Sequence, residues 1–150
     1  MSDGGSIRGR CLCGAVEFVL QPPTDFVAHC HCRSCRLAHG SPVTTWTSVP
    51  RDRFRFVKGR DAVNWYRSSR WIEWGFCSAC GSSMLYRAVE EGHHEAPRLD
   101  AMYVAVGSLI DPIDRPARTH VSFEERVDWL AYNDDLPKLL GKTDRRIDEP

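Results

Sequence analysis

The 150-residue chain lacks a long hydrophobic run and lacks an excess of charge of either sign. No segment approaches the ~20 consecutive apolar residues of a membrane-spanning helix. The 20 Lys and Arg residues balance the 20 Asp and Glu residues, so the formal net charge is zero. This composition argues against a protein that works mainly by electrostatic attraction to nucleic acid or anionic lipid. We therefore expect no membrane and no nucleic-acid partner.

The first residues also lack the charged and apolar regions of a secretion signal, which favours a cytoplasmic protein. In that reducing compartment, clustered cysteines serve more often as metal ligands or catalytic thiols than as disulfides. The chain has 7 cysteines, an odd number that disulfides alone cannot use up.

Long helical periodicity, internal repeats and interdomain linkers are missing as well. Short stretches of alternating or β-branched residues predict a mainly β fold of short antiparallel strands, at residues 15–20, 43–49, 54–57, 63–67, 71–77, 83–88 and 101–106. Strands 71–77 and 83–88 are expected to form a hairpin, and one short helix is expected between 129 and 140, with Pro137 in its first turn. We expect a single domain over residues 1–150, with a core of about 8–140 and a charged, frayed tail at 141–150.

The cysteines fall into two pairs and a triplet, Cys11-x-Cys13, Cys77-x-x-Cys80 and Cys30-x-Cys32-x-x-Cys35. A structural zinc site often takes four ligands from two chelating pairs that lie far apart in the chain. The two pairs therefore predict a four-thiolate zinc site formed by Cys11, Cys13, Cys77 and Cys80. The alternative is that these are small residues buried in a core.

The triplet Cys30, Cys32 and Cys35 leaves three ligands, and three protein ligands with one open position are typical of a catalytic zinc site. If this segment is extended, His29 and His31 point away from the thiols. A helical turn after Cys35 would instead bring His39 near the thiols as a fourth ligand, which would make the site a structural one. A redox pair of thiols is the third alternative.

Three stretches resemble a known family: Gly9-x-Cys11-x-Cys13-Gly14, Cys30-His31-Cys32-x-x-Cys35-Arg36 and Phe76-Cys77-x-x-Cys80-Gly81. They are similar to the GFA family, named for glutathione-dependent formaldehyde-activating enzyme and also called the CENP-V/GFA domain. Later stretches, among them 106–109 and 116–120, look like the second half of that family, so the resemblance covers roughly residues 8–140.

The resemblance implies a β-tent fold with two zinc ions, one structural on the four cysteines and one catalytic on Cys30, Cys32 and Cys35. It also implies a carbon-sulfur lyase similar to S-(hydroxymethyl)glutathione synthase, which joins glutathione to formaldehyde. Fold alone does not settle activity. The alternative is a non-enzymatic zinc-stabilised module that binds a partner protein, with both metals structural.

Glutathione carries two carboxylates, so a site for it should offer cations near the triplet. The candidates are Arg33, Arg36, Arg67 and Arg70, each of which is equally well an ordinary surface arginine. The tryptophans Trp46, Trp65, Trp71 and Trp74 could line a pocket, although such residues on short strands are more often core. The adjacent pair His93 and His94 is a weak metal candidate.

Overall fold

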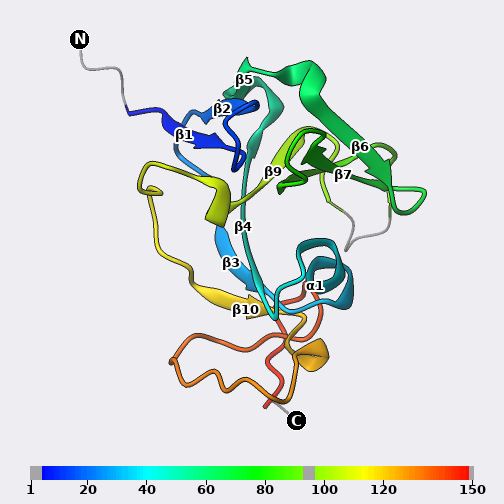
Figure 1. The fold of residues 1–150 in the computed structure, drawn as a ribbon. Coiled ribbons are helices and arrows are strands. Elements are labelled where there is room, and N and C mark those ends of the chain that lie inside the picture. The colour runs from blue at the N-terminus through cyan, green and yellow to red at the C-terminus, as the bar shows by residue number, and fades with distance from the viewer. Residues whose placement is uncertain (1–4, 93–96, 149–150) are drawn as a thin grey trace.

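Two β-sheets make up most of the computed structural model, which describes residues 5–92 and 97–148 (Figure 1). The smaller sheet has the strand order β1-β2-β5, and the larger has the order β10-β3-β4-β9-β8-β7-β6. All neighbouring strands are antiparallel except β3 and β10, which are parallel. The mainly β fold with antiparallel sheets is thus confirmed. His93 and His94 lie outside the described residues.

The elements are short, as the sequence predicts. The strands are β1 (Ile7–Arg10), β2 (Glu17–Leu20), β3 (Val27–Cys30), β4 (Thr44–Pro50), β5 (Phe54–Lys58), β6 (Val63–Arg67), β7 (Ile72–Cys77), β8 (Ser83–Ala88), β9 (Ala101–Ala105) and β10 (Thr119–Val121). One α-helix, α1 (Arg33–His39), occurs in the described ranges, with short 3₁₀ turns at Arg51–Arg53, Arg60–Ala62, Val106–Ser108 and Phe123–Glu125. No helix in the described part of the chain is long and apolar enough to span a membrane.

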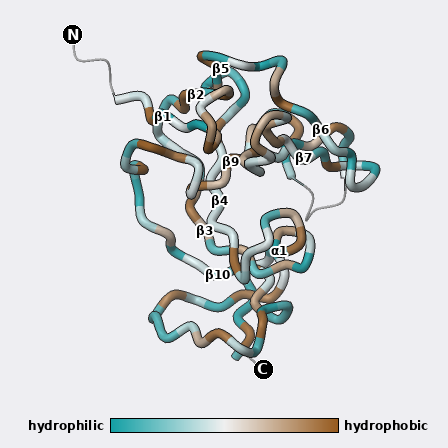
Figure 2. Tube along the Cα trace, in the orientation of Figure 1, coloured by the Kyte–Doolittle hydropathy of each residue, from teal (hydrophilic) through white to brown (hydrophobic). Residues whose placement is uncertain are grey.

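The two faces of the larger sheet carry different sets of side chains, because successive strand residues point to opposite sides. One face packs on the smaller sheet in a core that includes Phe18, Leu85 and Val104. The other face carries an aromatic cluster that includes Tyr86 and Tyr103 and packs beside Cys30 and Cys35. Hydrophobic stretches are short and alternate with hydrophilic ones along the trace (Figure 2). The sheet therefore separates a mainly aliphatic core from a mainly aromatic one, and each core contains cysteines.

Every predicted strand is present within a few residues, and the predicted hairpin is formed by β7 and β8. Strands β5 and β6 follow one another through Gly59, but they lie in different sheets. Gly59 has a φ of 69°, and a side chain there would collide with the backbone of Ala15. A glycine is required here because the turn must both adopt a left-handed conformation and pack tightly on the smaller sheet.

The short helix expected between residues 129 and 140 is not formed, and this prediction was wrong. Instead, the His120 N–H on β10 donates to Pro137 O, and the Leu139 N–H donates to His120 O. These bonds hold the segment in an extended conformation beside the sheet. The expectation of a frayed tail was also wrong up to residue 148. The Ile147 N–H donates to Lys138 O, the Leu140 N–H donates to Arg145 O, and the segment packs below β10 (Figure 1).

Candidate functional site

The two cysteine pairs meet at one end of the smaller sheet. The Sγ atoms of Cys11, Cys13, Cys77 and Cys80 all lie within 4.8 Å of one another. Cys11 and Cys13 precede β2, and Cys77 and Cys80 form the turn between β7 and β8. The left-handed glycines Gly14 and Gly81 follow the second cysteine of each pair and let each loop fold back.

The spacing of these sulfur atoms fits a tetrahedral metal ion. Sγ of Cys11 is 3.6 Å from that of Cys13, which is 3.9 Å from that of Cys77. A tetrahedron with Zn–S bonds of about 2.3 Å puts its sulfurs about 3.8 Å apart, much farther than the ~2.05 Å of a disulfide. The Val16 N–H donates to Cys11 Sγ at 3.2 Å. The Ser82 hydroxyl and the backbone of Cys13 lower the pKa of Cys80 to about 5. This cluster is thus suited to thiolates that hold zinc.

The cysteine triplet forms a second cluster at the start of α1. Its three Sγ atoms lie within 4.8 Å of one another, and no fourth His, Cys or acidic residue of the described chain joins them. Cys30 ends β3, and Cys32 is the N-cap of α1, where its Sγ accepts a hydrogen bond from the Cys35 N–H at 3.3 Å. Hydrogen bonds with Cys30 and then Cys35 lower the pKa of Cys32, whereas sharing with Cys32 raises the pKa of Cys30. The opposite directions of these shifts show that the thiols share hydrogen bonds, and a bound cation would favour the thiolate form of all three.

Two cavities, of about 390 and 300 Å³, adjoin this second cluster. Their walls share Cys35, Tyr86, Pro97 and Lys142. Trp46 and Tyr103 line the larger cavity, and Trp71 and Trp74 line the smaller one. The sulfurs of the triplet therefore face a space with aromatic walls.

The polar groups in these walls include a cation and a buried donor, beside the carboxylates Glu124, Glu125 and Asp144. Lys142 is the one cation of the described residues that lines the cavities, and its charge contributes to the lowered pKa of Cys32. Trp46 is 3 % exposed, and its Nε1 has no hydrogen-bond partner among the described residues. An unpaired buried donor is costly, so a ligand that accepts from it gains affinity.

A chain of hydrogen bonds supports the triplet from behind. His31 lies between Cys30 and Cys32, and its Nε2 is 2.7 Å from Nδ1 of His120, whose Nε2 is 2.8 Å from Asp134. Both histidines are buried, and burial together with the neighbouring His120 lowers the pKa of His31 to about 4. The chain ties the ligand-bearing segment to β10 and to the loop at residue 134.

The predicted histidine positions hold in part. His31 points away from the thiols into this chain, and His29 bonds Thr45 at 2.8 Å, as an extended segment predicts. His39 does not join the sulfurs, although α1 is helical. Its ring packs edge-on against Trp46, with Nε2 3.4 Å from the Ser83 hydroxyl, and burial lowers its pKa.

The four arginines proposed from sequence do not line these cavities. Arg36 donates to the backbone of His31, and Arg67 and Arg70 pair with Glu90. The backbone N–H of Arg33 donates to Glu125. Sequence reasoning missed Lys142, His120 and Asp134 because all three lie in the last third of the chain, where strands are short and turns dominate.

Comparisons with known proteins identify a family and a related fold. Residues 6–124 match the model of the family described as glutathione-dependent formaldehyde-activating enzyme. A protein of Schizosaccharomyces pombe named as an uncharacterized lyase is 29% identical over 81 residues, which are 53% of this chain and 56% of that protein. The chain thus matches just over half the length of this curated relative. A crystal structure of a Rhodobacter sphaeroides protein shares the fold, with a TM-score of 0.55 and 23% identity over 72% of this chain and 92% of the other.

Proposed function

The chain belongs to the glutathione-dependent formaldehyde-activating enzyme family, and from that premise we propose that it is a zinc-dependent carbon-sulfur lyase. Its thiol substrate is glutathione or a similar thiol, and its second substrate is formaldehyde or a related electrophile. One observation carries the proposal. The triplet has three sulfurs, has no fourth ligand among the described residues and lies beside cavities that contain a cation.

Cys30, Cys32 and Cys35 would hold the catalytic zinc, and Cys11, Cys13, Cys77 and Cys80 would hold a structural one. The zinc at the triplet supplies positive charge that favours the thiolate form of a bound thiol. The chain's own residues then position the reactants, which is a large part of the rate in a reaction of two molecules.

The reaction forms one bond between carbon and sulfur. The sulfur of the thiol adds to the carbonyl carbon, and the proton lost by the thiol ends on the former carbonyl oxygen. Trp46 Nε1 is a buried, unpartnered donor suited to that oxygen as its negative charge grows. Lys142 is placed to attract a carboxylate of glutathione. The aromatic walls limit the access of water, and the reverse reaction uses the same contacts.

The test measures exchange between free and thiol-bound formaldehyde by NMR, because the uncatalysed addition is itself reversible. The zinc-loaded protein should raise the exchange rate above that of glutathione and formaldehyde alone. In protein in which cobalt replaces zinc, glutathione should shift the visible bands of one of two metals, since these bands report the ligands of the ion. No rate increase together with an unmoved spectrum would contradict the proposal and favour the binding module.

The Lys142→Gln variant sharpens this test. Loss of one charge-assisted contact with a carboxylate should raise the KM for glutathione about tenfold. The matched control is Arg145→Gln, which removes a positive charge three residues away from a side chain that lines neither cavity. Equal effects of the two variants would mean that Lys142 acts only through the overall charge.

A further inference from the structure

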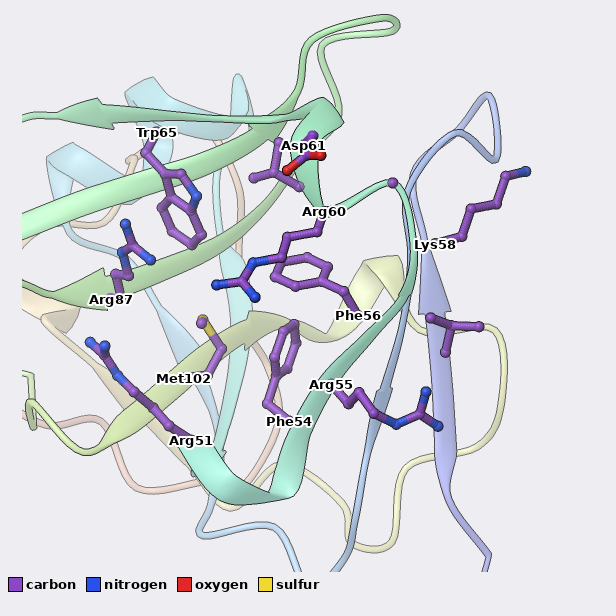
Figure 3. A pocket seen from close by; sticks show the side chains of 13 residues that line it. Arg51, Phe54, Arg55, Phe56, Lys58, Arg60, Asp61, Trp65, Arg87 and Met102 are labelled. Atoms are coloured by element: carbon purple, nitrogen blue, oxygen red, sulfur yellow. The ribbon is translucent and has the colours of Figure 1, made fainter.

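A second cleft lies on the other side of the larger sheet, where the edge strands β5 and β6 face each other across the turn at Arg60–Ala62 (Figure 3). Its volume is about 780 Å³. Five cationic residues line it, against one acidic residue of the described chain, Asp61. The chain as a whole is neutral, so this local excess of positive charge is a property of the fold.

The cleft is separate from the cysteine triplet. Arg87 and Met102 line it, whereas their chain neighbours Tyr86 and Tyr103 line the cavity beside Cys30 and Cys35. Neighbouring residues of a strand point to opposite faces of a sheet. A ligand in this cleft therefore cannot contact the triplet.

Three guanidinium groups converge on the cleft. Figure 3 shows the side chains of Arg51, Arg60 and Arg87 directed to a common space, while Arg55 and Lys58 point away from it. Arg87 is neutralised by Glu73 at 2.9 Å. Arg51 has only neutral partners, the backbone carbonyls of Ala88 and Ala101.

The positive charge of this cleft is not balanced from within. Desolvation, and then the nearby charge of Arg87, lower the pKa of Arg51, while the carboxylates of Asp100 and Glu73 act in the opposite direction. The side chain of Arg60 makes no hydrogen bond or ion pair with any described residue, and its backbone carbonyl accepts from the Val63 N–H. Among the described residues, Arg51 and Arg60 thus have no ion-pair partner.

Aromatic rings form the floor between these cations. The rings of Phe54 and Phe56 pack edge-to-face with centroids 5.0 Å apart, and the Arg87 guanidinium lies 3.8 Å from the centre of the Trp65 ring. Trp65 can lie flat on the sheet because its neighbour is Gly75, where a side chain would come within 2.9 Å of the ring. Partly exposed rings next to guanidinium groups suit a planar ligand that also carries negative charge.

We propose that this cleft binds a small ligand that joins a planar ring to at least two negative charges, as a mononucleotide does. The phosphate groups meet Arg51 and Arg60, and the ring stacks on the aromatic floor. This site is independent of the lyase function proposed above, because it lies on the opposite face of the sheet and needs no metal.

Binding of ADP to the zinc-loaded full-length protein tests the proposal, by calorimetry at low salt without magnesium. ADP should bind one site per chain, and more tightly than either pyrophosphate or adenosine. Arg60→Gln should weaken binding about tenfold through loss of one charge-assisted contact. Arg55→Gln is the matched control, since it removes the same charge from a side chain that points away, and it should change the affinity less than twofold.

Both variants should keep the wild-type melting temperature, because neither side chain has a hydrogen-bond or ion-pair partner in the described structure. Absence of saturable binding at millimolar ADP would overturn the proposal. Equal weakening by the two variants, or none by Arg60→Gln, would also overturn it, since the attraction would then come from overall charge or from another place. Pyrophosphate that binds as tightly as ADP would overturn the role given to the aromatic floor.

Discussion

The two cysteine clusters use the same side chain but are built in opposite ways. The four-sulfur cluster takes its members from loops at residues 11–13 and 77–80, and local backbone groups support them. The three-sulfur cluster takes all its members from six consecutive residues, while its supports and walls come from as far away as His120 and Lys142. The ligands of the first cluster come from parts of the sequence far from one another, and their supporting groups are close to them in sequence. The ligands of the second cluster are close together in sequence, and the residues around them come from far along the chain.

Under the proposed function, this difference separates a cluster that stabilises the fold from a cluster that performs chemistry. A metal that joins segments more than 60 residues apart closes a long loop, and its binding energy becomes folding energy. A metal held within one short segment closes almost no loop. Its removal should leave the sheets in place and affect the cavity. The following variants test this division.

Cys77→Ser should have the largest effect. Cys77 is fully buried and contributes one of the four sulfurs that join the early and middle chain. Structural zinc in small domains is worth about 10–16 kcal/mol, more than the usual stability of a domain. We expect loss of cooperative thermal unfolding by circular dichroism, with one metal lost in elemental analysis. Ser78→Ala, at the exposed neighbouring position, is the control. A Cys77→Ser protein that melts like the wild type would contradict the division.

Cys32→Ser should remove a metal while keeping the fold. Serine is a good N-cap, so the hydrogen bond from the Cys35 N–H to position 32 is kept. We expect a melting temperature within about 4 °C of the wild type, which corresponds to about 1 kcal/mol. One metal per chain and the formaldehyde exchange activity should be lost. Unfolding as complete as that of Cys77→Ser would show that both clusters stabilise the fold equally.

His120→Ala should have a smaller and more local effect. It leaves His31 and Asp134 without the partner that joins them, at a cost of about 2–4 kcal/mol, measured by urea unfolding. Zinc should pass faster to a chelator from the triplet and at an unchanged rate from the four-sulfur cluster. His120→Gln, which keeps a donor and an acceptor, should restore part of both properties. Equal acceleration of zinc loss at the two clusters would mean that the histidine chain serves only the fold.

The part of the fold that could be predicted from sequence is the part set by local patterns. Strands such as β4 and β8 have enough alternating or β-branched residues to be recognised. Strand β10 has three residues and pairs in parallel with β3, so neither a hairpin turn nor an alternating pattern predicts it from sequence. The segment at 129–140 has helix-forming residues, but hydrogen bonds to β10 outweigh that preference.

The candidate site divides in the same way. The two thiol groups follow from chelating distances along the chain, and the structure brings together the same two groups. Lys142 could not be found because its place depends on the return of residues 141–148 toward β10. The cleft around Arg60 depends on β5 and β6 belonging to different sheets, which their short connection concealed.

The distant origin of the cavity walls bears on how the protein is made. Domains generally begin to fold from the N-terminal side during synthesis. The triplet is complete once residue 35 has emerged, the four-sulfur cluster only after residue 80, and the wall at Lys142 later still. The nascent chain therefore presents three bare thiols to cellular metals well before the walls that enclose them exist.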